Sequence, residues 1–139
     1  MYLFDSDVLS QLAKKRRPEI LMARLAKAPL AAQFTSAVNV AEIYYGIFSM
    51  KGQESQQRSL LEFFEGQVFP RITILPFDEE SALTYGRIKS GLEQKGRPRF
   101  EPDLQIAAIA MRHGLTVVTG NVRHFAGIPR LKVENWLAA

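Results

Sequence analysis

The chain has 139 residues, 47% hydrophobic and 23% charged, which is the size and balance of one globular domain with its own hydrophobic core. No apolar run reaches the length of a membrane span, cysteine is absent, and no secretion signal precedes the first motif, so we expect a cytoplasmic protein without disulfides or a membrane partner. Two histidines and no cysteine exclude a conventional zinc site, so any metal must be held by oxygen. The formal net charge of +4 is a mild bias toward polyanionic partners.

The N-terminal segment carries the first candidate for a functional site. Residues 2–4 are apolar and predict a short buried strand, and two carboxylates, Asp5 and Asp7, follow where this strand ends. Ligands of an open parallel sheet bind outside the carboxyl ends of its strands, so both acids would lie at the mouth of a site. We predict that Asp7 is the N-cap of a helix starting at Val8. Asp5, which directly follows the buried strand, is predicted to have a functional role.

A basic run separates the first two predicted helices. The first helix ends at about Lys14, and the run that includes Lys14 and Lys15 stops at Pro18. These cations can bind phosphates, or they can form a solvated helix end that complements the helix dipole. A second helix is predicted over residues 20–28, and residues 33–35 are a weak candidate for the second strand.

A helical hairpin is predicted over about residues 37–66. Its first arm has four apolar residues at the spacing of one buried helical stripe, namely Val40, Ile43, Tyr44 and Ile47. Glu42 falls on the opposite side of this stripe, where periodicity alone places it in solvent. The second arm is rich in leucine and phenylalanine, which fits either the core or a dimer surface.

The next segment predicts a strand, a helix and a cationic loop. Residues 72–75, between two prolines, are typical of a third buried strand, and Asp78 is predicted to cap the long helix that follows. The loop after this helix carries Arg97 and Arg99 beside Phe100. This combination can hold a phosphate and stack a base, or it can form an ordinary loop.

The most apolar helix is predicted over residues 102–111. Beyond Asp103 only Gln105 is polar in this stretch, so the helix must be buried. Asp103 lies in the first turn, on the same side as Ile106 and Ala110, which directs a carboxylate inward. We therefore favour a functional role for Asp103 over simple compensation of the helix dipole.

Two further strands complete the predicted sheet. Residues 115–118 have the clearest strand pattern, Asn121 follows close to the carboxyl end of this strand, and a last strand is expected within residues 131–134. The alternation of strands and helices predicts the α/β class, with a three-layer α/β/α sandwich around a central parallel sheet of four to five strands. We expect a single domain over residues 1–139.

Three polar side chains are then expected to converge at one edge of the sheet, namely Asp5, Asp103 and Asn121. Oxygen ligands of this kind suit Mg²⁺ or Mn²⁺. Such an ion polarises a phosphodiester and lowers the pKa of a bound water, so an acidic pocket in a mildly basic protein indicates nucleic-acid hydrolysis. The sequence has no serine-centred elbow, phosphate-binding glycine loop or Cys/His pair that would indicate another chemistry.

Four blocks of sequence, in order, carry a resemblance to a known family. They are Leu-Phe-Asp-Ser-Asp-Val-Leu at 3–9, Thr-Ser-Ala-Val-Asn-Val-Ala-Glu-Ile-Tyr-Tyr-Gly-Ile at 35–47, Gly-Arg-Pro at 96–98 before Asp-Leu-Gln-Ile-Ala-Ala at 103–108, and Val-Thr-Gly-Asn-Val-Arg-His-Phe at 118–125. Together they resemble the PIN domain, specifically the VapC-type toxins of bacterial toxin–antitoxin systems. The resemblance spans nearly the whole chain.

This resemblance implies an activity, a ligand set and partners. Asp5, Glu42 and Asp103 would be the metal ligands of a Mg²⁺- or Mn²⁺-dependent endoribonuclease, in which a metal-activated water attacks an RNA phosphodiester. The helical hairpin would help to form a homodimer and the surface for a cognate VapB-type antitoxin. The antitoxin would block the site, and promoter DNA would be bound only through the toxin–antitoxin complex.

The chain departs from the family pattern at two positions. Asp7 stands where the opening motif usually has asparagine, so it either adds negative charge to the site or caps the helix. Asn121 stands where many PIN domains have a fourth acid, and His124 lies three residues further on. Asn121 can orient a metal-bound water as part of the catalytic set.

Two other interpretations remain open from the sequence. In a haloacid-dehalogenase-like phosphatase, Asp5 and Asp7 would be nucleophile and acid/base, but that family has Gly-Thr where this chain has Val8 and Leu9. The other is a non-catalytic PIN-like module that binds RNA or a protein without turnover, because Asn121 replaces an acid.

Overall fold

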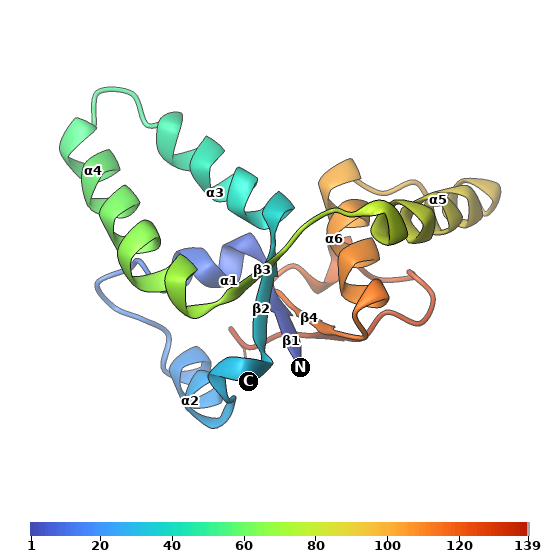
Figure 1. Cartoon of the computed structure of the whole chain (residues 1–139), viewed down its shortest axis with the longest axis horizontal. Coiled ribbons are helices and arrows are strands. Elements are labelled where there is room, and N and C mark those ends of the chain that lie inside the picture. The colour runs from blue at the N-terminus through green and yellow to red at the C-terminus, as the bar shows by residue number, and fades with distance from the viewer. Residues whose placement is uncertain (139) are drawn as a thin grey trace.

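Five short strands form one parallel sheet in the computed structural model, which describes residues 1–138 (Figure 1). The strands are β1 (Tyr2–Phe4), β2 (Gln33–Ser36), β3 (Thr73–Leu75), β4 (Thr116–Val118) and β5 (Val133–Glu134). Their order across the sheet is β3-β2-β1-β4-β5, and all neighbours are parallel. The predicted α/β class and the parallel sheet are confirmed. The strand order reverses between β1 and β4, which is the switch point where such sheets bind ligands.

Within residues 1–138, six α-helices cover the two faces of this sheet. They are α1 (Ser6–Gln11), α2 (Glu19–Lys27), α3 (Ala37–Phe48), α4 (Glu54–Phe63), α5 (Glu79–Gln94) and α6 (Glu101–Arg112). The α3–α4 hairpin and the α5–α6 pair lie on opposite sides of the strands (Figure 1). Helix α4 continues through a π-helical turn, Phe64–Val68, and a 3-10 turn, Phe69–Arg71, before β3 begins.

Strand alternation divides the core into two halves. Leu3 and Val117 point toward α6 and are fully buried there, whereas their neighbours Phe4 and Val118 point to the opposite face, toward α1, α3 and Trp136. Successive side chains of a strand point to opposite faces, so a central strand that is covered on both sides must be apolar throughout. This is why residues 2–4 could be identified as a buried strand.

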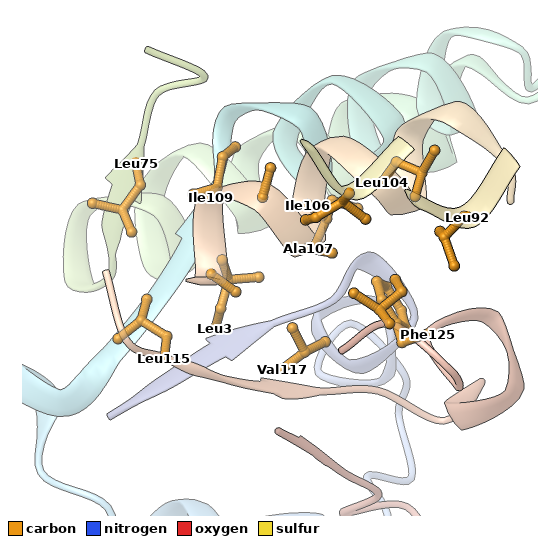
Figure 2. Packing of buried hydrophobic residues seen from close by; sticks show 14 residues of the cluster. Leu3, Leu75, Leu92, Leu104, Ile106, Ala107, Ile109, Leu115, Val117 and Phe125 are labelled. Atoms are coloured by element: carbon orange, nitrogen blue, oxygen red, sulfur yellow. The ribbon is translucent and has the colours of Figure 1, made fainter. Parts of the chain in front are cut away.

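Helix α6 has more buried residues than any other helix among the described residues. Its side chains from Leu104 to Ala110 are buried except Gln105, and Figure 2 shows several of them lying over β1 and β4. Complete burial of Ile106 and Ile109 contributes about 1.5–3 kcal/mol each to folding. The predicted buried helix is confirmed, and its burial fixes the position of Asp103 in its first turn.

The third strand is not buried as predicted. Thr73 and Ile74 of β3 are exposed, and Leu75 alone of its residues is buried. The strand lies at the edge of the sheet, where one side has no neighbouring strand. An apolar run between prolines predicts a strand, but it does not distinguish an edge from an interior position.

The α3–α4 hairpin turns through Gly52, whose φ of 72° is a conformation that glycine adopts without strain. Of the predicted stripe on α3, Ile43 and Ile47 are buried, whereas Val40 and Tyr44 are partly exposed. Tyr45 and Phe48 are strongly exposed on the other side of the helix. Within residues 1–138 no helix is long and apolar enough to cross a bilayer.

Candidate active site

Four acidic side chains gather at the carboxyl edge of the central strands. Asp5 and Asp7 follow β1, Glu42 comes from α3, and Asp103 comes from the first turn of α6. Their charges act on one another, since Asp5 raises the pKa of each of the other three. Asp5 and Asp103 are only 8% and 7% exposed. The structure therefore places the three acids that were predicted to hold a metal within electrostatic range of one another, and Asp7 lies among them.

Asp5 is fixed by hydrogen bonds to both carboxylate oxygens. Its Oδ1 accepts from the Ser6 backbone nitrogen and from Asn39 Nδ2, both at 2.9 Å, and its Oδ2 accepts from Thr119 Oγ1 at 2.8 Å. The first of these bonds makes Asp5 the N-cap of α1, which begins at Ser6. The prediction that Asp7 caps a helix starting at Val8 is wrong, because the chain turns into the helix directly after β1.

Asp7 instead spans from α1 to the loop after β4. Its Oδ2 accepts from the Gly120 backbone nitrogen at 2.8 Å and from Asn121 Nδ2 at 3.3 Å. A Cβ atom at Gly120 would lie 2.9 Å from Asp7 Oδ2 and 2.8 Å from Leu137 Cδ1, so only glycine allows this close approach. Asn121 is exposed, and its amide contacts a site carboxylate.

Glu42 faces a groove rather than open solvent. Its Oε1 accepts a hydrogen bond from Ser6 Oγ at 2.7 Å, and Ser6 Oγ in turn accepts from Asn39 Nδ2 at 3.1 Å. The groove has a volume of about 350 Å³, lies along α1 and α3, and has Lys14 on its lining. Helical periodicity alone placed Glu42 on the solvent side, and this was wrong because α1 and the Asp5 segment cover that side of α3.

Asp103 lies beside His124, whose Nδ1 is 3.5 Å from Asp103 Oδ2. Burial is the largest cause that raises the pKa of Asp103, to about 6, with the negative charges of Asp5 and Glu42 adding to it. The charge of His124 acts in the opposite direction and lowers this pKa. A carboxyl group whose pKa is raised by burial and by neighbouring acids is a feature typical of functional sites.

Burial is also the main cause that raises the pKa values of Asp7 and Glu42. For Asp7 the charge of Asp5 adds to burial, while the hydrogen bonds from Gly120, Val8 and Thr119 lower its pKa. For Glu42 the hydrogen bond from Ser6 acts against burial. Across the described chain, His124 is the one cationic side chain that acts on the pKa of any of these three acids. Hydrogen bonds and His124 thus offset the effect of burial only in part, and the pKa values of all three acids remain raised.

Two polar residues that sequence reasoning did not single out organise the cluster. Asn39 is fully buried and bridges Asp5 and Ser6, while its own Oδ1 accepts from Ser36 Oγ at 2.6 Å. Thr119 is fully buried and donates to Asp5. Asn39 lies four residues before Ile43 on the buried stripe, and a polar residue there needs a partner. That spacing was the available signal for Asn39, and the place directly after β4 was the signal for Thr119.

The donor set fits a hard divalent cation. Carboxylate and amide oxygens are the ligands that Mg²⁺ and Mn²⁺ prefer, and a cation bound beside Asp103 and Glu42 would lower the pKa values that burial and neighbouring acids raise. Within residues 1–138 no three acidic or histidine side chains are already assembled around one point. Without an ion between them the acids repel one another. Three of them instead accept a hydrogen bond from Thr119, Ser6 or Gly120.

The four cations predicted to contact RNA differ in their surroundings. Lys14, Lys15 and Arg97 are exposed, and Lys14 lines the groove beside Glu42. Arg99 is partly buried, and its Nη2 donates to the backbone oxygen of Ala126 at 2.5 Å. Arg99 therefore joins two loops beside the site, whereas the other three cations are accessible to a ligand.

Comparison with known proteins defines the class. The model of the PIN domain matches residues 2–131, so this chain belongs to the PIN domain family. It is 32% identical over 136 residues to ribonuclease VapC2 of Haemophilus influenzae, covering 98% of both chains. It is 33% identical over 132 residues to toxin FitB of Neisseria gonorrhoeae, covering 90% of this chain and 91% of that one.

A solved structure gives the same result. The fold matches a chain in the crystal structure of VapBC2 from Rickettsia felis bound to a DNA fragment from their promoter, with a TM-score of 0.80 and 31% identity. The match covers 97% of this chain and 98% of that chain. The predicted resemblance to the PIN domain family is therefore confirmed.

Proposed function

We propose that this protein is a Mg²⁺- or Mn²⁺-dependent endoribonuclease that acts as the toxin of a toxin–antitoxin pair in the cytoplasm. The observation that supports this most is the cluster of four acids at the switch point of the sheet, in which burial and the charge of Asp5 raise the pKa values of Asp7, Glu42 and Asp103. The similarity to a protein named a ribonuclease and to one named a toxin agrees with this function.

The residues have separate roles in this proposal. Asp5, Glu42 and Asp103 would hold the ion, which when bound supplies an activated water and stabilises negative charge on the phosphoryl oxygens. Asn39 and Thr119 donate to Asp5 and hold its carboxylate in one orientation. Asn121 and Gly120 hold Asp7 at the edge of the cluster. His124 places a proton donor or cation beside Asp103 where RNA would approach.

Accessible cations near the acids would bind the RNA backbone. Lys14 and Lys15 lie beyond the end of α1, and Arg97 lies in the loop before α6. An RNA strand bound at the acidic cluster would meet positive charge from these two segments, which favours a polyanion over a small phosphomonoester. The phosphatase alternative is less favoured, because that family has Gly-Thr after its second aspartate, where this chain has Val8 and Leu9.

We further propose a VapB-type antitoxin as partner and a homodimer as the assembly. The exposed Tyr45 and Phe48 on α3 are large apolar side chains of the kind found at interfaces. Promoter DNA would be contacted through the antitoxin complex, by analogy with the similar R. felis VapBC2, which is bound to a DNA fragment from its promoter.

Cleavage of total RNA by the purified protein tests the function. We expect cleavage with Mg²⁺ or Mn²⁺, none with EDTA, and none by Asp5→Asn or Asp103→Asn in either condition. Glu62→Gln, an exposed acid on α4, makes the same chemical change outside the site and is the matched control. If both site variants cut as well as wild type, the assignment is wrong; if wild type binds RNA but never cuts it, the non-catalytic module is the better description.

A further inference from the structure

A second groove lies along α5, apart from the acidic cluster. It has a volume of about 360 Å³ and is bounded by α5 and by residues 129–130. Ile88 and Leu92 are 7% and 2% exposed and form its floor together with Met111. A cavity of this size with an apolar floor is large enough for an organic ligand or a nucleotide unit.

The rim of this groove is cationic. Arg87, Lys95 and Arg130 line it and are exposed, and no acidic residue lines it. Within residues 1–138 none of the three takes part in an ion pair. By contrast Lys89, on another side of the same helix, lies 2.6 Å from Glu101. The groove thus brings together three cationic side chains that are not neutralised by ion pairs within the described residues.

Arg130 has a backbone that an arginine rarely adopts. Its φ is 67°, and within residues 1–138 it is the one non-glycine residue with a positive φ. Glycine or asparagine takes this conformation with less strain, so an arginine here brings a cation to the rim at the expense of local stability. Strained positions of this kind cluster at functional sites.

One segment connects the groove to the acidic cluster. His124 contacts Asp103, and Arg130 follows six residues later, which limits the distance between them to ~20 Å. Arg99 Nη2 bonds to the Ala126 oxygen between them, which ties this segment to the loop before α6. A polymer bound at the cluster can therefore reach the groove within a few monomer lengths.

We propose that this groove binds a single-stranded stretch of RNA some nucleotides away from the cleaved bond, with its phosphates on the cationic rim and a base against the apolar floor. The proposal rests on the proposed nuclease function. Arg87 and Lys95 are eight residues apart on α5, a separation of ~12 Å along the helix axis, which suits successive phosphates better than one small anion. Apolar and cationic groups side by side are the usual means of binding single strands without sequence preference.

The test is the salt dependence of RNA binding. Anisotropy of 5′-labelled oligoribonucleotides of about 4 and about 20 nucleotides, measured in EDTA over a salt series, reports the number of phosphates that the protein neutralises. For the long strand, the slope of log K against log salt should fall by about 2 in the triple variant Arg87→Gln, Lys95→Gln, Arg130→Gly, since each cation contributes ~0.7. The short strand should show little change.

Three variants serve as controls. The triple variant Lys27→Gln, Lys51→Gln, Arg58→Gln makes the same change in net charge on α2 and the hairpin and should leave the slope as in wild type. Gly91→Leu fills the groove without changing charge, because space is open at the Gly91 Cβ position, and should weaken binding of the long strand about fivefold or more. Arg130→Gly alone should weaken binding while raising the melting temperature.

Equal slopes in the two triple variants would overturn the proposal, as would equal affinity of wild type for the short and long strands. A change of oligomeric state in the groove variant, measured by sedimentation, would instead show the groove to be a protein contact and would also overturn it. RNA cleavage is measured separately. If the protein binds the long strand through this groove but cuts no RNA, the nuclease proposal is wrong and the proposed binding site stands.

Discussion

The acidic residues at the two ends of helix α6 have pKa values shifted in opposite directions. At its C-terminal end, Arg112 Nε lies 2.9 Å from Asp78 Oδ2, and Arg112 Nη2 lies 3.3 Å from Glu80. Hydrogen bonds from Ser81, followed by the charge of Arg112, lower the pKa of Asp78. At its N-terminal end, burial and neighbouring acids raise the pKa of Asp103 to about 6.

This difference indicates that Asp78 stabilises the fold, whereas Asp103 is placed to bind a ligand. Asp78 caps α5 and pairs with a cation of α6, so its charge is neutralised within the protein. Asp103 is buried among like charges, which raise its pKa against the opposing effect of His124, so its ionised form carries an electrostatic cost. A bound divalent cation would remove that cost, which is why such a cluster indicates a metal site.

The largest expected effect comes from removing single carboxylates at the N-terminal end. Asp5→Asn and Asp103→Asn should each lower the rate of RNA cleavage by about 100-fold or more, because each removes a ligand of the ion. Asp78→Asn should leave the rate within about twofold, since that acid touches nothing in the site. The measurement is the cleavage rate of each variant on one RNA at saturating Mn²⁺. Equal losses of rate in all three variants would contradict the difference between the two ends of α6.

The next effect concerns Asn39, which orients Asp5 without charge of its own. Asn39→Ala should lower cleavage about 10–100-fold, as expected for a residue that positions a ligand. The protein should still bind Mn²⁺, though more weakly, and higher Mn²⁺ should restore part of the activity. A variant with full activity would show that Asp5 is held well enough by Thr119 and Ser6 alone.

The third prediction is a gain of stability. The pKa of Asp103 is raised from 3.8 to about 6, so the folded protein binds this proton more tightly than the unfolded chain between these pH values. The ionised Asp103 carboxylate therefore lowers the free energy of unfolding fully above about pH 6, and this destabilisation is lost as the pH falls toward 3.8. Asp103→Asn should therefore raise the free energy of unfolding at pH 7.5 by about 1–3 kcal/mol without metal.

The control for that gain is its pH dependence, measured by denaturant unfolding in EDTA. The advantage of Asp103→Asn should shrink steadily from pH 7.5 to pH 4.5. A gain that is the same at both pH values would assign it to packing rather than to charge.

The smallest effect is expected at the other end of α6. The pKa of Asp78 is lowered, so its contribution to stability is present above its ordinary pKa of 3.8 and is lost as the pH falls below it. Asp78→Ala should lower the melting temperature at pH 7.5, because α5 loses its cap and Arg112 loses a partner. Thermal unfolding at pH 7.5 and pH 3 checks the sign; a stabilised variant would mean that the two clusters do not differ as described.

Much of the fold could be predicted because local patterns are strong in this chain. The buried strand at residues 2–4 and the apolar helix around Ile106 could hardly be placed elsewhere than in the core. The exposed edge position of β3 could not be predicted, since it depends on strand order across the sheet and not on the local run.

The acids of the candidate site could be predicted from the sequence, but the polar residues that hydrogen-bond to them could not. Asp5 and Asp103 stand beside apolar residues, where a charge is conspicuous, whereas Glu42 could be placed through the family resemblance alone. Asn39 and Thr119 are ordinary polar residues until the chain folds and brings them to Asp5. The cap at Asp5 rather than Asp7 depends on where the backbone turns, and both residues satisfy the sequence rule for a cap.

The most direct test of the central claim is calorimetric titration of the protein with Mn²⁺ at pH 7.5. We expect binding by wild type and binding weakened about tenfold or more in Asp5→Asn, Glu42→Gln and Asp103→Asn, with Glu62→Gln unchanged. Absence of Mn²⁺ binding by wild type, or wild-type affinity in all three site variants, would contradict the claim that these acids form one metal site.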